Sequence, residues 1–352
     1  MNKEQHSLRG LAILMIVMLH SGVLYTADYS FIYHKFISVT DMQMGVELLF
    51  VLAGFFLSKS LCKYSDSPCS IRKAAKEALY ILKKKIKRLL PALLVWTLIP
   101  FILSIVCSDG VWLSEGVMRQ KFISSVFFVR NFTEGNHPSA FGYIWAVSLE
   151  MQFFVAFSFL FFLTGRNKML CLAIIVIFIN TFYRLPGNET LFMFRFDSLL
   201  GGYVAYILYE KLKNNNMTAK VSPSLRLTLM LVLIISLMTC GRYFDQLSDF
   251  KFSAATLISI VIVVLASLEL NIFQPIESKL LNYFADRSYS LYCCHIPSWF
   301  IMISAFNYFG LNHSYMWPFQ IIFMLICTEI TYRYIENMIM RLDLKSRPAS
   351  VT

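Results

Sequence analysis

The chain has 352 residues, of which 57% are hydrophobic and 15% charged, and it carries a formal net charge of +11 at pH 7. This composition is typical of a polytopic membrane protein and excludes an ordinary soluble domain. The basic residues cluster in loops beside apolar runs, which argues against a nucleic-acid-binding face and for contact with anionic membrane lipids.

Apolar runs long enough to cross a bilayer recur from one end of the chain to the other. Only helices satisfy all backbone polar groups within one lipid-embedded segment. We therefore predict an all-α polytopic membrane protein of about ten transmembrane helices, built as a single domain over residues 1–352 with no separate soluble domain. The predicted spans are 8–26, 42–62, 89–107, 143–164, 169–185, 193–212, 225–240, 252–270, 284–306 and 315–337.

The distribution of basic residues predicts the topology. The stretch from Lys63 to Arg88 holds nine Lys or Arg, and smaller basic groups follow near Arg166, near Lys211 and in the tail 341–347. The alternate loops 186–192 and 307–314 carry almost none. Because cytoplasmic loops are enriched in Lys and Arg, we place both termini in the cytoplasm. The loop 63–88 has helical spacing and is expected to lie partly along the membrane surface.

Three further features of the sequence limit the possible functions: the first apolar run, the cysteines and the longest external segment. The first apolar run lacks a small-residue cleavage site, so we expect a retained first span rather than a signal peptide. The eight cysteines have no metal-like spacing, and we predict packing roles for them and no metal site. The longest external segment, 108–142, is the expected lid or acceptor rim.

Arg9 and His20 lie in the first apolar run, "SLRGLAILMIVMLH". An ionisable side chain at the centre of a span costs about 2.5–3.5 kcal/mol, so each such residue is a candidate for function. On a continuous helix the two residues share a face, about 16 Å apart along the axis. The functional interpretation places Arg9 at the cytoplasmic mouth of a channel and His20 deep within it. The alternative is a snorkelling anchor and a hydrogen-bonded core histidine.

Glu47, Glu150 and Arg195 are further candidates within the predicted spans. Glu47 is expected to pair with Arg9 or to orient His20, or else to form a buried ion pair without chemistry. Glu150 and Gln152 cannot both face one pore, and we favour Glu150 because a carboxylate needs a polar cavity more than an amide does. Arg195 requires a partner on another helix or a ligand anion.

The last two spans carry polar stripes. Ser288, Tyr292 and His295 follow i, i+4, i+7 spacing and share one helix face, just before Pro297. Glu329, Arg333 and Glu336 follow the same spacing. We interpret this second stripe as a self-neutralising structural ladder.

Seven stretches, taken in order, resemble the membrane acyltransferase-3 family, which O-acylates bacterial cell-surface sugars. The Arg9–His20 spacing matches its opening motif, and "KIKRLLP" its Arg-x-x-Arg-x-x-Pro element, with Lys85 in place of the first arginine. "WAVSLEMQFF" matches a third element, with Met151 in place of its second glutamate. The other four are "GVELLFVLAGFFL", "RFDSLLGG", "SYSLYCCHIP" and "YRYIEN".

The resemblance implies an O-acyltransferase of the bacterial cytoplasmic (inner) membrane. The donor would be acyl-coenzyme A, with acetyl as the default acyl group. Its phosphates would be held by Lys85 and Arg88, with Arg9 holding part of the donor or stabilising the oxyanion. His20 would act as general base or carry the acyl group covalently.

The same resemblance implies that Glu150 shares the catalytic site with His20 and Arg9. Glu47, Arg195, Tyr292 and His295 would line the substrate cavity, into which a carbohydrate or lipid-linked glycan such as O-antigen would bring its hydroxyl.

Two other classes of protein stay open. A transporter would use the buried polar residues as a substrate path, although we find no internal repeat of the kind common in transporters. A non-catalytic subunit of polysaccharide assembly would tolerate loss of His20.

Overall fold

The computed structural model describes residues 2–24, 31–63, 68–107, 109–133, 140–183, 194–214, 222–244 and 250–338, apart from the side chains of 31–33. Within these ranges the chain is helical and contains no β-strand. The all-α prediction is thereby confirmed for the described residues. The loop 186–192 and the basic tail 341–347 lie outside them.

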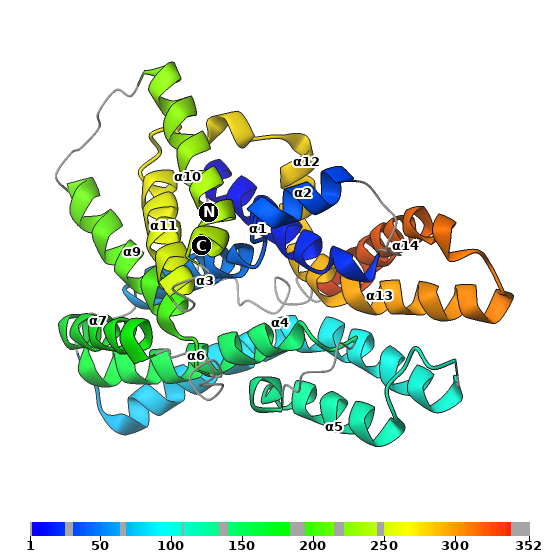
Figure 1. The fold of residues 1–352 in the computed structure, drawn as a ribbon. Coiled ribbons are helices and arrows are strands. Elements are labelled where there is room, and N and C mark those ends of the chain that lie inside the picture. Colours follow the sequence, from blue (N-terminus) through cyan, green and yellow to red (C-terminus); the bar gives the residue numbers. More distant parts are fainter. Residues whose placement is uncertain are drawn as a thin grey trace. The chain divides into compact units, whose positions relative to one another are not determined.

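Figure 1 shows the helices in chain order. The longer helices are α1 (Lys3–Leu19), α3 (Met44–Leu61), α4 (Ile71–Val106), α5 (Glu115–Val126), α6 (Ile144–Thr164), α7 (Arg166–Tyr183), α9 (Asp197–Asn214), α10 (Pro223–Tyr243), α11 (Phe250–Ser267), α13 (Ser288–Phe309) and α14 (Met316–Ile330). Shorter elements are η1 (Ser21–Val23), α2 (Phe31–Val39), η2 (Arg130–Phe132), η4 (Gln274–Ile276), α12 (Lys279–Asp286), η5 (His313–Tyr315) and the π-helical turn η6 (Thr331–Glu336).

The helices fall into two compact units. The described residues of the first unit lie within Met1–Leu19, Tyr29–Leu79 and Gln152–Asp286, and those of the second within His20–Asp28, Tyr80–Met151 and Arg287–Thr352. Helices α4 and α6 each contribute residues to both units. The prediction of one domain over the whole chain stays a prediction.

The first unit is centred on α3, which packs against α1, α9 and α11. Glycine allows the closest of these approaches. A Cβ on Gly54 would lie 1.9 Å from the carbonyl oxygen of Leu199, and one on Gly202 would lie 2.3 Å from that of Val51. The glycines of "LAGFF" and "LLGGY" therefore let the backbones of α3 and α9 touch, which fixes the side chains beside them.

The second unit is built on α13, which packs against α14 and η6. One hydrogen bond connects α13 to α4, and another connects η6 to α4. The Tyr289 hydroxyl donates to the Leu89 carbonyl at 2.5 Å, and the Trp96 indole donates to the Thr331 hydroxyl at 2.9 Å. Pro297 lies inside α13, where it removes one backbone donor without ending the helix.

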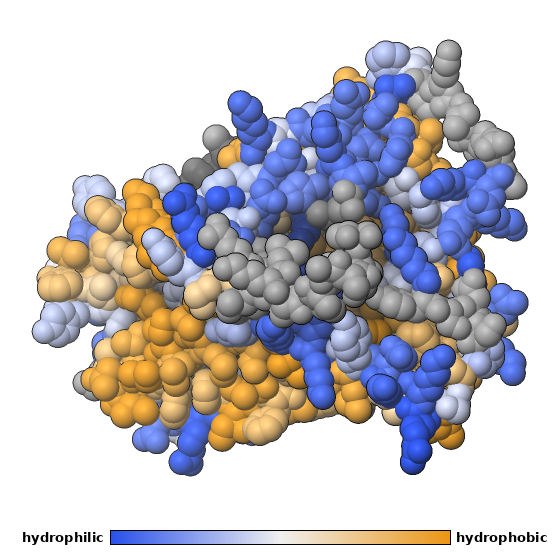
Figure 2. Space-filling view, turned by 180° about the vertical axis from the view of Figure 1, so that it is seen from behind, coloured by the Kyte–Doolittle hydropathy of each residue, from blue (hydrophilic) through white to orange (hydrophobic). Residues whose placement is uncertain are grey.

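Six helices among the described residues are long and apolar enough to cross a membrane. They cover Lys3–Val23, Met44–Leu61, Ile71–Val106, Ile144–Thr164, Pro223–Tyr243 and Phe250–Ser267. Their outer faces carry exposed apolar side chains, for example Ile102 on α4 and Val232 on α10. Figure 2 shows hydrophobic residues covering a wide part of one face. A soluble protein would not leave so much apolar surface in water, and the chain is an integral membrane protein.

Each of the ten predicted spans overlaps a helix, but the boundaries differ at two informative places. Helix α1 ends at Leu19, so His20 lies in the turn before η1 rather than within a continuous helix. The basic loop 63–88 was expected to be helical and to lie partly along the membrane surface. From Ile71 it is helical, and this helix continues without a break into the apolar part of α4. Its Lys, Ala, Leu and Glu residues are strong helix formers, and none of them ends the helix.

Candidate functional site

Two histidines lie together in the second unit, where the turn after α1 meets α13. The ring centroids of His20 and His295 are 5.3 Å apart and their planes are inclined by 44°. His295 is completely buried, whereas His20 is partly exposed. The sequence placed these residues in the catalytic site and in the substrate cavity respectively, and the structure brings them into one cluster.

The His295 ring has a defined orientation because one of its nitrogens is held by the backbone. Nδ1 lies 2.9 Å from the Tyr292 carbonyl oxygen. A carbonyl only accepts hydrogen bonds, so Nδ1 carries the proton. In the neutral ring Nε2 then has a free lone pair. Nε2 is buried and has no hydrogen-bond partner among the residues that the structure describes. The cluster therefore contains a buried nitrogen able to accept a hydrogen bond.

Three aromatic side chains enclose His295. The ring centroids of Tyr143, Tyr292 and Trp299 lie 5.1, 5.9 and 5.7 Å from that of His295. The Tyr143 hydroxyl donates to the Cys293 carbonyl at 2.5 Å, and the Tyr292 hydroxyl donates to the Tyr143 carbonyl. Both phenols thus bind backbone and hold the loop before α6 against α13.

Sequence reasoning missed two members of this cluster. Trp299 follows His295 by four residues on α13, and this i+4 spacing is a signal that it shares the histidine's face. Tyr143 comes from a distant segment, and nothing in the sequence indicates its contact with α13. Tyr292 was predicted to line the cavity, and it contacts His295 directly.

Lys85 and Glu150, which were given separate roles, form an ion pair in the second unit. Lys85 Nζ lies 2.8 Å from Glu150 Oε1, and both side chains are about one-fifth exposed, at 20% and 21%. Glu150 is thus neutralised by a cation of α4, and Lys85 already has a carboxylate partner. A phosphate at Lys85 would have to compete with that carboxylate.

Arg88 and Glu336 form a second, looser pair at 3.8 Å. Glu336 is buried and also accepts a hydrogen bond from Ser290 at 2.8 Å. The predicted ladder is therefore only partly present: Glu329 pairs with Arg333 and with Arg287, each at 2.5 Å, while Glu336 turns to α13 and α4. The π-helical turn at 331–336 explains the difference, because its i→i+5 pattern displaces Glu336 from the α-helical stripe.

Arg195 and Glu47 form a buried ion pair in the first unit. Both side chains are at most 1% exposed. Ser198 donates to the same carboxylate and lies 2.6 Å from the Thr256 hydroxyl, and the ring of Phe252 lies 4.0 Å from the guanidinium carbon. The expected pairing of Glu47 with Arg9 is corrected, because Glu47 pairs with Arg195 and so forms the buried ion pair that was the alternative. A role of Glu47 in orienting His20 stays a prediction. The expectation that Arg195 finds a partner on another helix is confirmed.

Arg9 lies half-buried on α1 in the first unit, and His20 belongs to the second. The described part of the expected lid belongs to the second unit, where the Trp112 indole donates to Ser304 at 3.3 Å. Residues 108 and 134–139 of that lid lie outside the described residues. The roles of Arg9 and of the lid stay predictions.

The cysteines give no sign of a metal centre in the parts of the chain that the structure describes. All eight are free thiols, and Cys240, Cys293, Cys294 and Cys327 are buried in the packing. Among the described residues, no group of three or more His, Cys, Asp or Glu side chains is placed to hold a metal ion.

The chain is similar in sequence to known acyltransferases. The family described as an acyltransferase domain, acyltransferase-3, matches residues 6–330. The O-acetyltransferase OatA of Staphylococcus aureus, in strains NCTC 8325, COL and MRSA252, is 23% identical over 339 residues, covering 86% of this chain and 53% of the relative. The chain thus spans about half the length of the curated relatives it matches. No solved structure matches the chain.

Proposed function

Because the chain belongs to the acyltransferase-3 family and is therefore an acyltransferase, we propose that it is a membrane O-acyltransferase acting on a sugar. It transfers an acyl group, acetyl by default, from cytoplasmic acyl-coenzyme A to a hydroxyl of a surface or lipid-linked glycan. The similarity to an O-acetyltransferase supports the choice of acetyl and of an oxygen acceptor. The observation that carries the proposal is the contact between His20, which is partly exposed, and the buried His295.

The histidine cluster supplies what an acyl transfer needs. The acceptor oxygen attacks the thioester carbonyl, the C–S bond breaks, and the hydroxyl proton must go to a base. On this proposal His20 takes the proton, and His295 is its positioning partner because its ring is fixed at Nδ1 and holds an acceptor at Nε2. As the coenzyme A thiolate leaves, it takes this proton from His20, which returns to its neutral form. The aromatic rings around His295 keep water away from this exchange.

The remaining predicted residues divide between donor and acceptor. Lys85 and Arg88 are proposed to bind donor phosphate after exchanging the carboxylates of Glu150 and Glu336 for it. Arg9 is proposed to bind the donor or stabilise the oxyanion. This exchange releases Glu150 from Lys85, and on this proposal the free carboxylate orients the base His20. The pair of Glu47 and Arg195 is proposed to shape the wall of the acceptor cavity.

The finer features of topology are part of the proposal. We propose ten spans in one domain over residues 1–352, both termini in the cytoplasm and residence in the bacterial inner membrane. Six candidate spans and the overlap of all ten predicted ranges with helices support this arrangement. A fluorescent protein fused after Thr352 should fluoresce, whereas alkaline phosphatase fused at the same point should be inactive. The opposite pair of results would contradict a cytoplasmic carboxyl terminus.

The first test of function measures ester-linked acyl groups on the host's surface glycans by NMR. Wild type, a deletion strain and a strain expressing correctly inserted His20→Ala are compared. Loss of one O-acetyl signal in both mutants would support the proposal and name the acceptor. If the deletion strain loses the ester but His20→Ala keeps it, the assignment of His20 is wrong. If neither mutant changes any O-acyl ester, other acceptors and then the transporter become the better explanations.

A further inference from the structure

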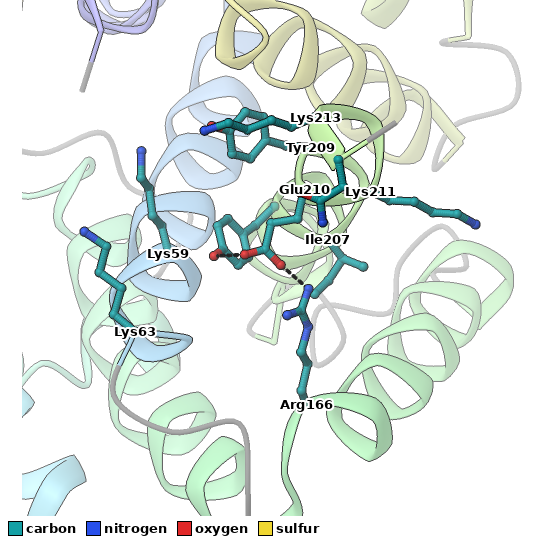
Figure 3. A pocket seen from close by; sticks show the side chains of 10 residues that line it. Lys59, Lys63, Arg166, Ile207, Tyr209, Glu210, Lys211 and Lys213 are labelled. Carbon is teal, nitrogen blue, oxygen red and sulfur yellow. Dashed lines mark hydrogen bonds and ion pairs between the residues drawn. The ribbon is translucent and has the colours of Figure 1, made fainter. Parts of the chain in front are cut away.

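A strongly basic pocket lies in the first unit, separate from the histidine cluster (Figure 3). It is formed by the carboxyl-terminal turns of α3 and α9 and by the start of α7. Its volume is about 480 Å³, which falls within the roughly 300–1,000 Å³ of sites for small molecules. It is lined by five cationic side chains and one carboxylate: Lys59, Lys63, Arg166, Lys211, Lys213 and Glu210.

One wall of the pocket is ordered by hydrogen bonds. Arg166 forms an ion pair with Glu210, whose other oxygen accepts a hydrogen bond from Tyr206. The hydroxyl of Tyr203 donates to the Arg166 carbonyl at 2.8 Å, so the start of α7 is tied to α9. The single carboxylate of the pocket is therefore already used, and it does not neutralise the lysines.

The lysines are not neutralised by other described residues. Lys59 lies in the last turn of α3 and Lys63 just after its end, and neither forms an ion pair with a described carboxylate. Lys213 lies over the ring of Tyr209 at 5.7 Å from its centroid, whereas Lys211 points away from the others in Figure 3. With Arg166 held by Glu210, an excess of positive charge faces one cavity, which favours a ligand with more than one negative charge.

We propose that this pocket binds a ligand with at least two phosphate groups, and that this ligand is the nucleotide end of the acyl donor, held here in place of Lys85 and Arg88. The assignment to the donor rests on the proposed function. Phosphate is the anion that ammonium groups bind as point charges, and Tyr209 offers an aromatic face beside them. Lys85 and Arg88 each have a carboxylate partner in the second unit, so the pocket lysines present the less compensated charge. An anionic lipid headgroup shares the same chemistry and is the other source of such a ligand.

The test is direct binding by the purified full-length chain in nanodiscs of neutral phosphatidylcholine. Coenzyme A, pantetheine and inorganic pyrophosphate are the probes. The double variant Lys63→Ala/Lys213→Ala should weaken coenzyme A binding by roughly 10- to 100-fold, as expected for loss of charge-assisted hydrogen bonds. Pyrophosphate should compete and pantetheine should not. Lys168→Ala removes an exposed charge of α7 outside the pocket and should change affinity less than about twofold.

The other outcomes separate this inference from the proposed function. If the double variant binds coenzyme A like wild type while Arg88→Ala does not, the pocket assignment is overturned and the proposed donor stands. If nanodiscs with phosphatidylglycerol show a lipid contact that the double variant loses, with coenzyme A binding unchanged, the phosphate is a lipid headgroup and the donor assignment is overturned. If wild type binds pyrophosphate through these lysines but not coenzyme A, the proposed donor is wrong.

Discussion

Replacing Glu47 by glutamine is expected to destabilise the chain more than removing both charges of the Glu47–Arg195 pair. In Glu47→Gln the Ser198 hydroxyl keeps an acceptor, but the buried guanidinium of Arg195 loses the carboxylate charge of Glu47. In Glu47→Gln/Arg195→Met both charges of the pair are removed, and the methionine side chain can pack on Phe252 as the guanidinium does.

The burial of the pair sets the expected magnitude. Breaking a buried ion pair from one side costs about 3–5 kcal/mol, whereas apolar replacement of the whole pair is often neutral. An unfolding entropy of about 2.1 cal/mol/K per residue corresponds to about 0.7 kcal/mol/K for a chain of this length, so Glu47→Gln should lower Tm by about 4–7 °C. The double variant should regain part of this loss, because Asp197, a buried carboxylate beside Arg195, keeps its charge.

Buried thiols provide the assay. A dye that fluoresces on reaction with cysteine reports unfolding in detergent, because Cys240, Cys293, Cys294 and Cys327 are buried and free. Arg333→Gln is the matched control, since it removes a charge of an ion pair whose arginine is 65% exposed. Such surface pairs contribute about 0–1 kcal/mol, so Tm should fall by no more than about 1 °C.

A double variant as unstable as Glu47→Gln alone would refute charge compensation as the role of this pair. The same strains also test the proposed place of Glu47 and Arg195 at the acceptor cavity. If the double variant regains stability together with O-acetylation of the glycan, the pair is structural. Stability without O-acetylation would show that one of the two side chains acts on the substrate.

Four further predictions follow from the packing, the histidine cluster and the basic pocket. Gly54→Ala should prevent stable folding or cost more than about 3 kcal/mol, because the added Cβ would lie 1.9 Å from the Leu199 carbonyl oxygen. The control Gly116→Ala, with open space around its Cβ, should leave Tm unchanged or slightly raised in the same thiol assay. His295→Gln should lower the transfer rate by about 10²-fold or more with Tm within a few degrees of wild type; an unchanged rate in radiolabelled acetyl transfer would remove His295 from the mechanism. Tyr143→Phe should cost about 1 kcal/mol through the lost bond to the Cys293 carbonyl and slow transfer less than His295→Gln does; an equal loss would make the phenol a direct participant. Binding of pyrophosphate should weaken as NaCl rises from 50 to about 500 mM, because salt screens exposed charges; salt-independent binding would argue against the basic pocket.

The sequence by itself determined the class of fold and the family. Hydrophobic runs of bilayer length depend only on local composition, and each predicted span overlaps a helix. The ordered motifs identified the acyltransferase-3 family, which matches nearly the whole chain. Spacing along one helix also placed Tyr292 and His295 on a common face, because that relation is set by helix geometry alone.

Only the tertiary structure decided which polar residues meet. Glu47 pairs with Arg195 instead of Arg9 because glycines bring α3 and α9 into backbone contact. Lys85 and Glu150 neutralise each other across 65 residues of sequence. Tyr143 reaches His295 from the loop before α6. Each of these contacts joins segments far apart in the chain, and a helical pattern gives the direction of a side chain around its own axis but not the helix that it will face.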